Sequence, residues 1–223
     1  MEIKLRDVPE LNYSVNNINS ETGIPEPTGE ILMRGPIVFK GFLNDEKNTK
    51  ESFDKDGWLL TGDVGVILTG NGNAIRLIDR VKSIFKLSQG EYIAPEKIEN
   101  ILSKSIYVHQ IYVTGLSQKS FVLGFIVPNK KSIAELLQKK GIPFDVKRIT
   151  EMYNEKEILT KIISDLDHVG RMNGLKGFEL VKKIKLIEEP FSIENNLITL
   201  TLKLKRTELK KKFYNDIIYL YSS

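Results

Sequence analysis

Asp63, Arg80 and Lys203 are charged residues whose sequence neighbours suggest chemistry on sugars and phosphates. Asp63 lies in the run Gly57-Trp-Leu-Leu-Thr-Gly-Asp-Val-Gly65, where glycines flank it. A carboxylate on a rigid glycine turn can accept hydrogen bonds from both hydroxyls of a sugar diol, with no long side chain to order. The competing interpretation is an Asx turn, in which the carboxylate caps only its own loop.

Arg80 follows Asp79 at the end of the apolar run Ala74–Ile78. Its guanidinium is always charged and can hold phosphate or ribose oxygens as a planar fork. The alternative is a surface ion pair, which contributes little to stability. Lys82 comes two residues later, and its side chain alone indicates no role.

A second candidate turn lies in the run Lys86-Leu-Ser-Gln-Gly-Glu-Tyr92. Gly90 has no side chain, so a substrate could approach the backbone closely there. Lys86 and Glu91 flank this glycine and are the charged candidates of the turn. The alternative is a turn glycine that only precedes a helix.

Lys203 lies near the end of the run Pro190-Phe-Ser-Ile-Glu-Asn-Asn-Leu-Ile-Thr-Leu-Thr-Leu-Lys-Leu-Lys-Arg206. A lysine ammonium on a loop can neutralise the negative charge on carboxylate and phosphoryl oxygens that react with each other. The alternative is that Lys203 is one of many exposed lysines on a solvated face.

The elements that must position these residues differ on the two sides of Arg80. The first third is β-rich, after an irregular lead-in over residues 1–28 that contains at most one strand. Hydrophobic alternation and breakers predict strands at 30–34, 64–68 and 74–78. The run Thr69-Gly-Asn-Gly-Asn73 is a hairpin signal between the last two strands. A short helical or turn segment is expected over residues 44–53.

After Arg80 the pattern becomes mixed. Pro95 is a suitable first helical residue, and Ile98, Ile101 and Leu102 form one apolar stripe behind it. We expect strands at 84–87, 107–114, 121–127 and 180–187, of which the middle two are paired. We expect further helices at 131–140, closed by Gly141 and Pro143, at 158–169, and at 208–220 with Leu209, Phe213, Ile217 and Leu220 facing inward.

The composition excludes several classes of function. The 223 residues include no cysteine, so a disulfide, a thiolate metal site and a cysteine nucleophile are impossible. His109 and His168 stand alone, without the partner spacing of a metal site. A net charge of +4, from 33 basic and 29 acidic residues, is too small to indicate a nucleic-acid binder. No apolar run approaches the ~20 residues of a membrane-spanning helix.

In this order, the runs 57–65, 78–99 and 190–206 resemble the adenylate-forming enzymes, and among these the long-chain acyl-CoA synthetases. The resemblance implies an α+β fold with two parts. Residues 1–80 would be the β-rich end of the large N-terminal AMP-binding domain. Residues 81–223 would be the small, mobile C-terminal domain, with a hinge near Lys82.

The same resemblance implies roles for the candidate residues. Asp63 would hold the ribose hydroxyls of ATP, and Arg80 would also contact the nucleotide. Lys203 matches the catalytic lysine of adenylation. Gly90, with Lys86 and Glu91, would serve the thioester step beside the pantetheine of CoA.

The chain departs from the family pattern next to Lys203. Leu200 stands where the family usually has proline, and Leu202 where it has a bulkier or aromatic residue. Without the proline, the backbone of this loop is less restricted.

The implied activity is a two-step ligation. A fatty acid, ATP and Mg²⁺ would give acyl-adenylate and pyrophosphate, and CoA would then displace AMP. The implied partners are these substrates, the N-terminal domain of the same protein and the surface of a membrane, with no nucleic acid. The implied location is the cytoplasmic side of the endoplasmic reticulum or of other membranes, through regions outside this chain.

The resemblance covers only the C-terminal part of such an enzyme, because the phosphate-binding loop, the adenine segment and the acyl tunnel lie upstream of it. We therefore expect the chain alone to be inactive in adenylation. Two alternatives stay open: a ligase of the same superfamily for another acid, and a non-catalytic interaction module. In the second, the basic residues of 203–206 and 210–212 would dock on a membrane or a carrier protein, rather than form a solvated helix face.

Overall fold

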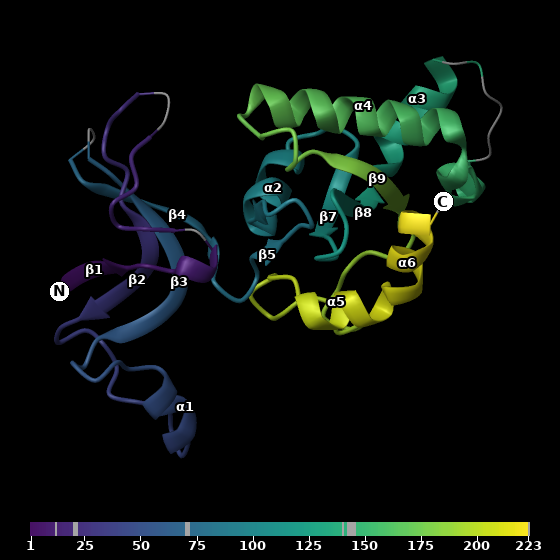
Figure 1. Cartoon of the computed structure of the whole chain (residues 1–223). Coiled ribbons are helices and arrows are strands. Elements are labelled where there is room, and N and C mark those ends of the chain that lie inside the picture. The colour runs from purple at the N-terminus through teal and green to yellow at the C-terminus, as the bar shows by residue number, and fades with distance from the viewer. Residues whose placement is uncertain (12, 20–21, 70–71, 140, 142–145, 223) are drawn as a thin grey trace. The chain divides into compact units, whose positions relative to one another are not determined.

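The computed structural model describes residues 1–11, 13–19, 22–69, 72–139, 141 and 146–222 (Figure 1). The chain divides into two compact units, Met1–Ile84 and Phe85–Ser223. The sequence placed a boundary slightly earlier, at Arg80–Lys82. The assignment of the two parts to an AMP-binding domain and a mobile domain stays a prediction.

The first unit contains one antiparallel sheet with the strand order β1-β2-β3-β4. Its strands are β1 (Glu2–Arg6), β2 (Thr28–Arg34), β3 (Leu59–Leu68) and β4 (Ala74–Arg80). Two short helices, η1 (Pro9–Leu11) and α1 (Glu46–Glu51), lie in its connections. The three predicted strands are confirmed, although β3 begins at Leu59, earlier than expected. Part of the predicted hairpin turn, residues 70–71, lies outside the described residues.

The core of the first unit forms on the central strands. Leu32 of β2 and Val64 and Val66 of β3 are almost fully buried. Gly65 lies between them, and a Cβ atom there would lie 2.8 Å from the Cδ1 atom of Ile31. A larger residue at this position would therefore force the Ile31 side chain to shift.

The second unit contains a three-stranded sheet of order β7-β8-β9 and a two-stranded sheet, β5-β6. Its strands are β5 (Phe85–Lys86), β6 (Tyr92–Ile93), β7 (Val108–Thr114), β8 (Val122–Pro128) and β9 (Val181–Leu186). Its helices are α2 (Pro95–Leu102), α3 (Lys130–Lys139), η2 (Val146–Asn154), α4 (Lys156–Met172), α5 (Arg206–Lys212) and α6 (Tyr214–Ser222). The predicted pairing of the strands now labelled β7 and β8 is confirmed, and β9 joins β8 in parallel.

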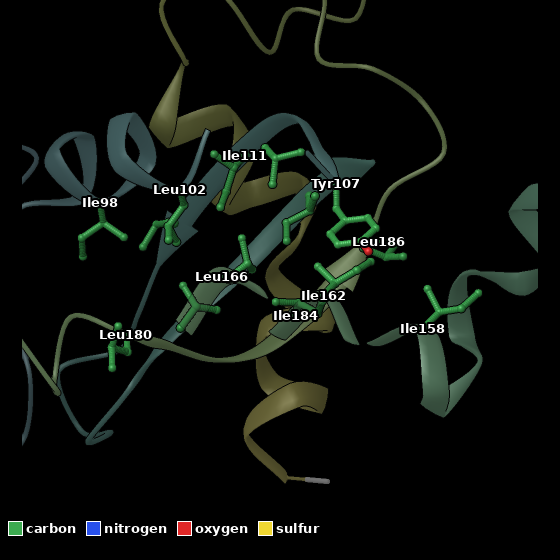
Figure 2. Packing of buried hydrophobic residues seen from close by; sticks show 14 of the residues in the cluster. Ile98, Leu102, Tyr107, Ile111, Ile158, Ile162, Leu166, Leu180, Ile184 and Leu186 are labelled. Carbon is green, nitrogen blue, oxygen red and sulfur yellow. The ribbon is translucent and has the colours of Figure 1, made fainter. Parts of the chain in front are cut away.

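Strand β8 separates two hydrophobic clusters, because successive side chains of a strand point to opposite faces. Val122 and Ile126 belong to the cluster formed with α2, α3 and α4. Leu123 and Phe125 belong to the other cluster, formed with α5 and α6. Figure 2 shows the first cluster, in which the side chains of α2 and α4 meet those of β7 and β9. With both faces covered, every residue of β8 is buried.

One predicted helix is wrong in its extent. The expected helix at 208–220 is two helices, α5 and α6, separated at Phe213. Leu209, Phe213 and Ile217 still face inward as predicted, because the break does not change the apolar side of the segment. Helix α3 confirms the helix expected at 131–140, but its predicted closing residues, except Gly141, lie outside the described residues.

Candidate functional site

Asp63 does not lie on a turn, as the sequence suggested, but inside strand β3. It lies directly opposite Arg80 of β4, and the Arg80 Nε atom is 3.1 Å from Asp63 Oδ1. Residues that face each other across antiparallel strands have Cβ atoms about 5 Å apart, so this register makes the pair possible. Both side chains keep part of their surface exposed, 33% for Asp63 and 54% for Arg80. The structure therefore brings these two predicted residues together at one accessible point.

The backbone next to Asp63 is held by a buried acid that the sequence analysis missed. Glu30 of β2 is only 5% exposed, and its carboxylate accepts hydrogen bonds from the Gly62 N–H (3.1 Å) and from Arg6. The Thr61 hydroxyl accepts the N–H of Asp63 at 3.1 Å. Gly62 has a φ angle of +71°, a conformation that glycine adopts without strain. These contacts hold the backbone that leads into Asp63.

A pocket of about 430 Å³ lies beside this arrangement in the first unit. Its lining includes both polar and charged side chains, among them Arg6, Glu30, Asn48, Glu51, Thr61, Arg80 and Lys82. Lys82 is exposed, in the turn that follows β4. On either side of it, the Val81 N–H donates to the Gly62 carbonyl (2.9 Å) and the Ser83 N–H donates to the Arg80 carbonyl (2.9 Å).

The predicted turn at Gly90 is present between β5 and β6. The Gly90 N–H donates to the Leu87 carbonyl at 3.0 Å, and the φ angle of Gly90 is +93°. A Cβ atom there would meet only the Lys86 side chain, at 3.9 Å. The backbone conformation, rather than lack of space, is therefore what requires glycine. Lys86 and Glu91 are both exposed, and the Lys86 Nζ atom lies 5.0 Å from the ring centroid of Tyr92.

The β7–β8 loop holds the Gly90 turn from the side. The Ser88 N–H donates to the Lys119 carbonyl at 3.0 Å, and the Gln89 side-chain amide donates to the Ser120 carbonyl at 2.9 Å. This support could not be predicted from the sequence, because the two loops are about thirty residues apart along the chain. The turn is thus attached to the main sheet of the second unit.

Lys203 lies on a small hydrogen-bonded hairpin, which we call the 199–203 loop. The Thr199 N–H donates to the Lys203 carbonyl (2.8 Å), and the Lys203 N–H donates to the Thr199 hydroxyl (3.1 Å). Leu202 has a φ angle of +60°, which is uncommon for a residue other than glycine. Leu200 and Leu202 are 84% and 73% exposed, so no apolar contact anchors the tip of the loop. In the part of the chain that the structure describes, the Lys203 ammonium forms no ion pair.

A buried ion pair lies close to this loop, and the sequence analysis missed it as well. Glu99 of α2 is 7% exposed. Its carboxylate accepts both terminal nitrogens of Arg206, at 3.0 and 2.6 Å, and the N–H of Val113 at 2.7 Å. The only sequence signal was an acid within the apolar face of α2, next to Ile98. Arg206 could not be paired with it before the fold was known.

A second pocket, of about 340 Å³, includes Lys203 and this ion pair. It lies wholly in the second unit, between α2 and the segment that carries Lys203. Its other lining residues are Glu96, Asn100, Ser103, Ile111, Leu202 and Leu204. The Lys203 side chain therefore lines a partly polar cavity and is not on a flat surface.

The described residues contain no candidate metal centre and no candidate membrane-spanning helix. No three His, Cys, Asp or Glu side chains in these ranges come together to hold a metal ion. His109 and His168 are both exposed. None of the described helices has the length and apolar character needed to cross a membrane.

Several curated proteins are similar in sequence to almost the entire chain. It is 47% identical over 222 residues to a protein of Rattus norvegicus named long-chain-fatty-acid–CoA ligase 5. It is 45% identical over 220 residues to long-chain-fatty-acid–CoA ligase 6 of Homo sapiens. It is 40% identical over 221 residues to long chain acyl-CoA synthetase 7, peroxisomal, of Arabidopsis thaliana. Each match covers 99% of this chain and 30% of the relative.

Solved structures with a similar fold also match the entire chain. The adenylation domain of a carboxylate reductase from Mycobacterium chelonae is similar with a TM-score of 0.84 and 30% identity, over 100% of this chain and 31% of that domain. The corresponding domain from Segniliparus rugosus, solved with AMP and a co-purified carboxylic acid, has a TM-score of 0.81 and 31% identity, with the same coverage. No protein-family model matches the chain. The chain thus spans about 30% of the length of the curated relatives it matches.

Proposed function

This chain is homologous over 99% of its length to long-chain acyl-CoA synthetases, and we propose that it is the C-terminal part of a long-chain fatty acid–CoA ligase. The observation that carries the proposal is a sequence identity of 40–47% over 99% of the chain, a match that extends across both units. The whole enzyme would activate a fatty acid with ATP and transfer the acyl group to CoA. It would work at the cytoplasmic side of cellular membranes, to which other regions of the protein would attach it.

In the first half-reaction, a carboxylate oxygen of the fatty acid attacks the α-phosphorus of ATP, and pyrophosphate leaves. Negative charge on the carboxylate and phosphoryl oxygens must be neutralised as they approach each other. Lys203 supports this role because it is exposed, has no ion pair among the described residues and lines a pocket. Its ammonium would contact the reacting oxygens.

Asp63 and Arg80 would hold the nucleotide in this reaction. The Asp63 carboxylate can accept hydrogen bonds from the ribose hydroxyls, and Arg80, at 3.1 Å, orients that carboxylate. A bound ribose would take the exposed side of this pair. Mg²⁺ would enter with the phosphates of ATP.

In the second half-reaction, the thiol of CoA attacks the acyl carbonyl and AMP leaves. The Gly90 turn supports a role here because its backbone is exposed and held from the side by the β7–β8 loop. A pantetheine chain can approach such a backbone closely. Lys86 and Glu91 would line its path, and a change of torsion angles near Lys82 would exchange one half-reaction for the other.

The test of the proposal separates the two half-reactions in the full-length enzyme. We expect Lys203→Ala to lower fatty-acid-dependent ATP–pyrophosphate exchange by about 10²–10³-fold, the usual effect of removing one charge-stabilising group. CoA thioester formation from supplied acyl-adenylate should stay near the wild-type rate. Lys205→Ala is the matched control and should leave both rates unchanged.

Equal loss of both half-reactions in Lys203→Ala would remove the assigned role of this lysine. The 223-residue chain, assayed alone, should show no adenylation. Absence of activity with every chain length in the full-length protein would instead favour a non-catalytic interaction module.

A specific observation supports one alternative within the same superfamily. The solved structures at 30–31% identity are adenylation domains of carboxylate reductases. The acid activated here could therefore differ from a long-chain fatty acid. The exchange assay with a panel of acids of different chain length decides whether the substrate is a long-chain fatty acid or another acid.

A further inference from the structure

The Glu99–Arg206 ion pair is the most enclosed charged contact near Lys203. The side chains of Glu99 and Arg206 are 9% and 19% exposed. The pairing is bidentate, with nitrogen–oxygen distances of 3.0 and 2.6 Å. Two parallel hydrogen bonds between a guanidinium and a carboxylate fix both direction and distance, which a single ion pair does not.

The acid of this pair belongs to a rigid part of the second unit. On both sides of Glu99 in helix α2, Ile98 and Leu102 are 0% and 1% exposed and belong to the main hydrophobic cluster. The Glu99 carboxylate also accepts the N–H of Val113 on β7. A helix and a strand together therefore set its position.

The arginine belongs to the segment that carries Lys203. Arg206 is the first residue of α5, three positions after Lys203. Between them, Leu204 forms a bridge with Ile198, and the Lys205 N–H donates to the Leu197 carbonyl at 2.8 Å. The returning arm of the hairpin, residues 203–206, thus connects Lys203 directly to the arginine of the ion pair.

Little else orders the tip of the 199–203 loop. Leu200 and Leu202 are mostly exposed, and the loop lacks apolar contacts that would hold it. Its own hydrogen bonds preserve the shape of the hairpin, and its base is held by the second hydrophobic cluster, which contains Leu197 and Ile198 and against which Leu204 packs. Arg206 adds a charged attachment on the side of Lys203, because it joins the returning arm to α2 and β7.

We propose that Glu99 and Arg206 are positioning residues for Lys203, and that their bidentate pair sets where the lysine ammonium lies during adenylation. This inference rests on the proposed function. The pair does not touch the reacting atoms; it acts through three residues of backbone. Its effect should therefore fall on the half-reaction that uses Lys203 and not on the half-reaction that uses the Gly90 turn.

The first experiment measures both half-reactions in the full-length enzyme with Arg206→Met, Arg206→Lys and Glu99→Gln. A displacement of about 1 Å in a catalytic group can cost about 10²-fold in rate. We expect Arg206→Met to lower the kcat of ATP–pyrophosphate exchange by about tenfold to 10²-fold, with little change in the KM for ATP. Arg206→Lys keeps the charge and should recover part of the loss, and thioester formation from supplied acyl-adenylate should change less than about threefold.

Arg171→Met is the matched control, because it removes an arginine–carboxylate pair on α4, outside the lining of the Lys203 pocket. It should leave both half-reactions unchanged. If Arg206→Met lowered both half-reactions equally, or neither of them in an active enzyme, the positioning role would be wrong. If Arg206→Met fails to fold, Arg206→Lys still tests the proposal, because it retains the ion pair in a weaker form.

A second experiment does not depend on activity. Hydrogen exchange of the Thr199, Leu202 and Lys203 amides is measured in the 223-residue chain, because these amides close the hairpin. Arg206→Met should speed their exchange by about tenfold relative to wild type and to Arg171→Met. Unchanged exchange would overturn the inference even if the enzyme is a ligase. Faster exchange with an inactive wild-type enzyme would support the contact and reject the proposed function.

Discussion

Glu30 is a buried acid whose role could be assigned only from the structure. Its carboxylate is 5% exposed and lies between Arg6 and the N–H of Gly62. Removing the charge leaves these donors with a poorer acceptor in a place that water reaches with difficulty. Because Gly62 precedes Asp63, loss of the Glu30 charge should both lower the free energy of unfolding and displace the Asp63 carboxylate.

We expect Glu30→Gln to lower the free energy of unfolding of the first unit by about 1–3 kcal/mol, the usual cost of a lost hydrogen bond to a charged group. Trp58 is the single tryptophan of the chain and is 9% exposed in this unit. Its fluorescence during urea unfolding therefore measures the stability of the first unit alone.

Glu2→Gln is the matched control, since Glu2 also pairs with an arginine across β1 and β2. That pair, with Arg34, is exposed, so its loss should change stability by less than about 0.5 kcal/mol. Equal effects of the two substitutions would show that the burial of Glu30 has no energetic consequence.

At the scale of elements, helix α6 is attached to the sheet by its last tyrosine. The Tyr221 hydroxyl donates to the Phe121 carbonyl at 2.7 Å, and the two rings lie 5.0 Å apart. Burial of the hydroxyl raises the pKa of Tyr221 to about 12. Burial also raises the pKa of Tyr112 and of Tyr153 in the same unit.

A raised tyrosine pKa has a definite effect on stability. Below pH 10 the phenol is neutral in both the folded and the unfolded chain, so its contribution to stability is fully present. Between pH 10 and about 12 the unfolded chain loses this proton and the folded chain keeps it. The free energy of unfolding must therefore fall as pH rises through this interval.

We expect Tyr221→Phe to make this alkaline fall in the stability of the second unit less steep. At neutral pH the variant should lose about 0.5–1.5 kcal/mol, because the hydrogen bond to Phe121 is gone. Urea unfolding followed by circular dichroism at several pH values measures both effects. Tyr219→Phe, on the exposed side of α6, should leave the curve unchanged; identical slopes for Tyr221→Phe and wild type would contradict the prediction.

At the scale of the whole molecule, the boundary between the two compact units falls between Ile84 and Phe85 in the sequence. Lys82 lies just before this point, in a turn held by the N–H groups of Val81 and Ser83. A hinge needs only a few backbone torsion angles that can change. Proline at such a position would restrict one of them.

We expect Lys82→Pro in the full-length enzyme to separate the half-reactions, so that one falls by at least about tenfold more than the other. Lys82→Ala keeps the torsional freedom and should leave both near the wild-type rate. The two rates are measured as ATP–pyrophosphate exchange and as thioester formation from acyl-adenylate. Equal effects on both rates in Lys82→Pro would place the hinge elsewhere.

The sequence by itself determined the main elements and several local features of the site. Apolar periodicity located β7, β8, α2 and α4, because burial of one or both faces leaves a repeating pattern in the chain. Gly90 was predicted at a turn, and it is there, because a positive φ angle favours glycine. The motif order indicated the long-chain acyl-CoA synthetases, and the relatives that match the chain carry names of this kind.

Only the tertiary structure decided which charged residues meet. Asp63 was expected on a turn but lies in β3 opposite Arg80, since strand register depends on the packing of the whole sheet. The partners of Glu30 and Glu99 are far away in sequence, 32 residues to Gly62 and 107 residues to Arg206. A buried acid leaves no periodic signal of its own, and its partner is fixed only when the elements pack against each other. Local chain chemistry therefore predicted the turns and strands, and long-range packing determined the contacts that hold the site.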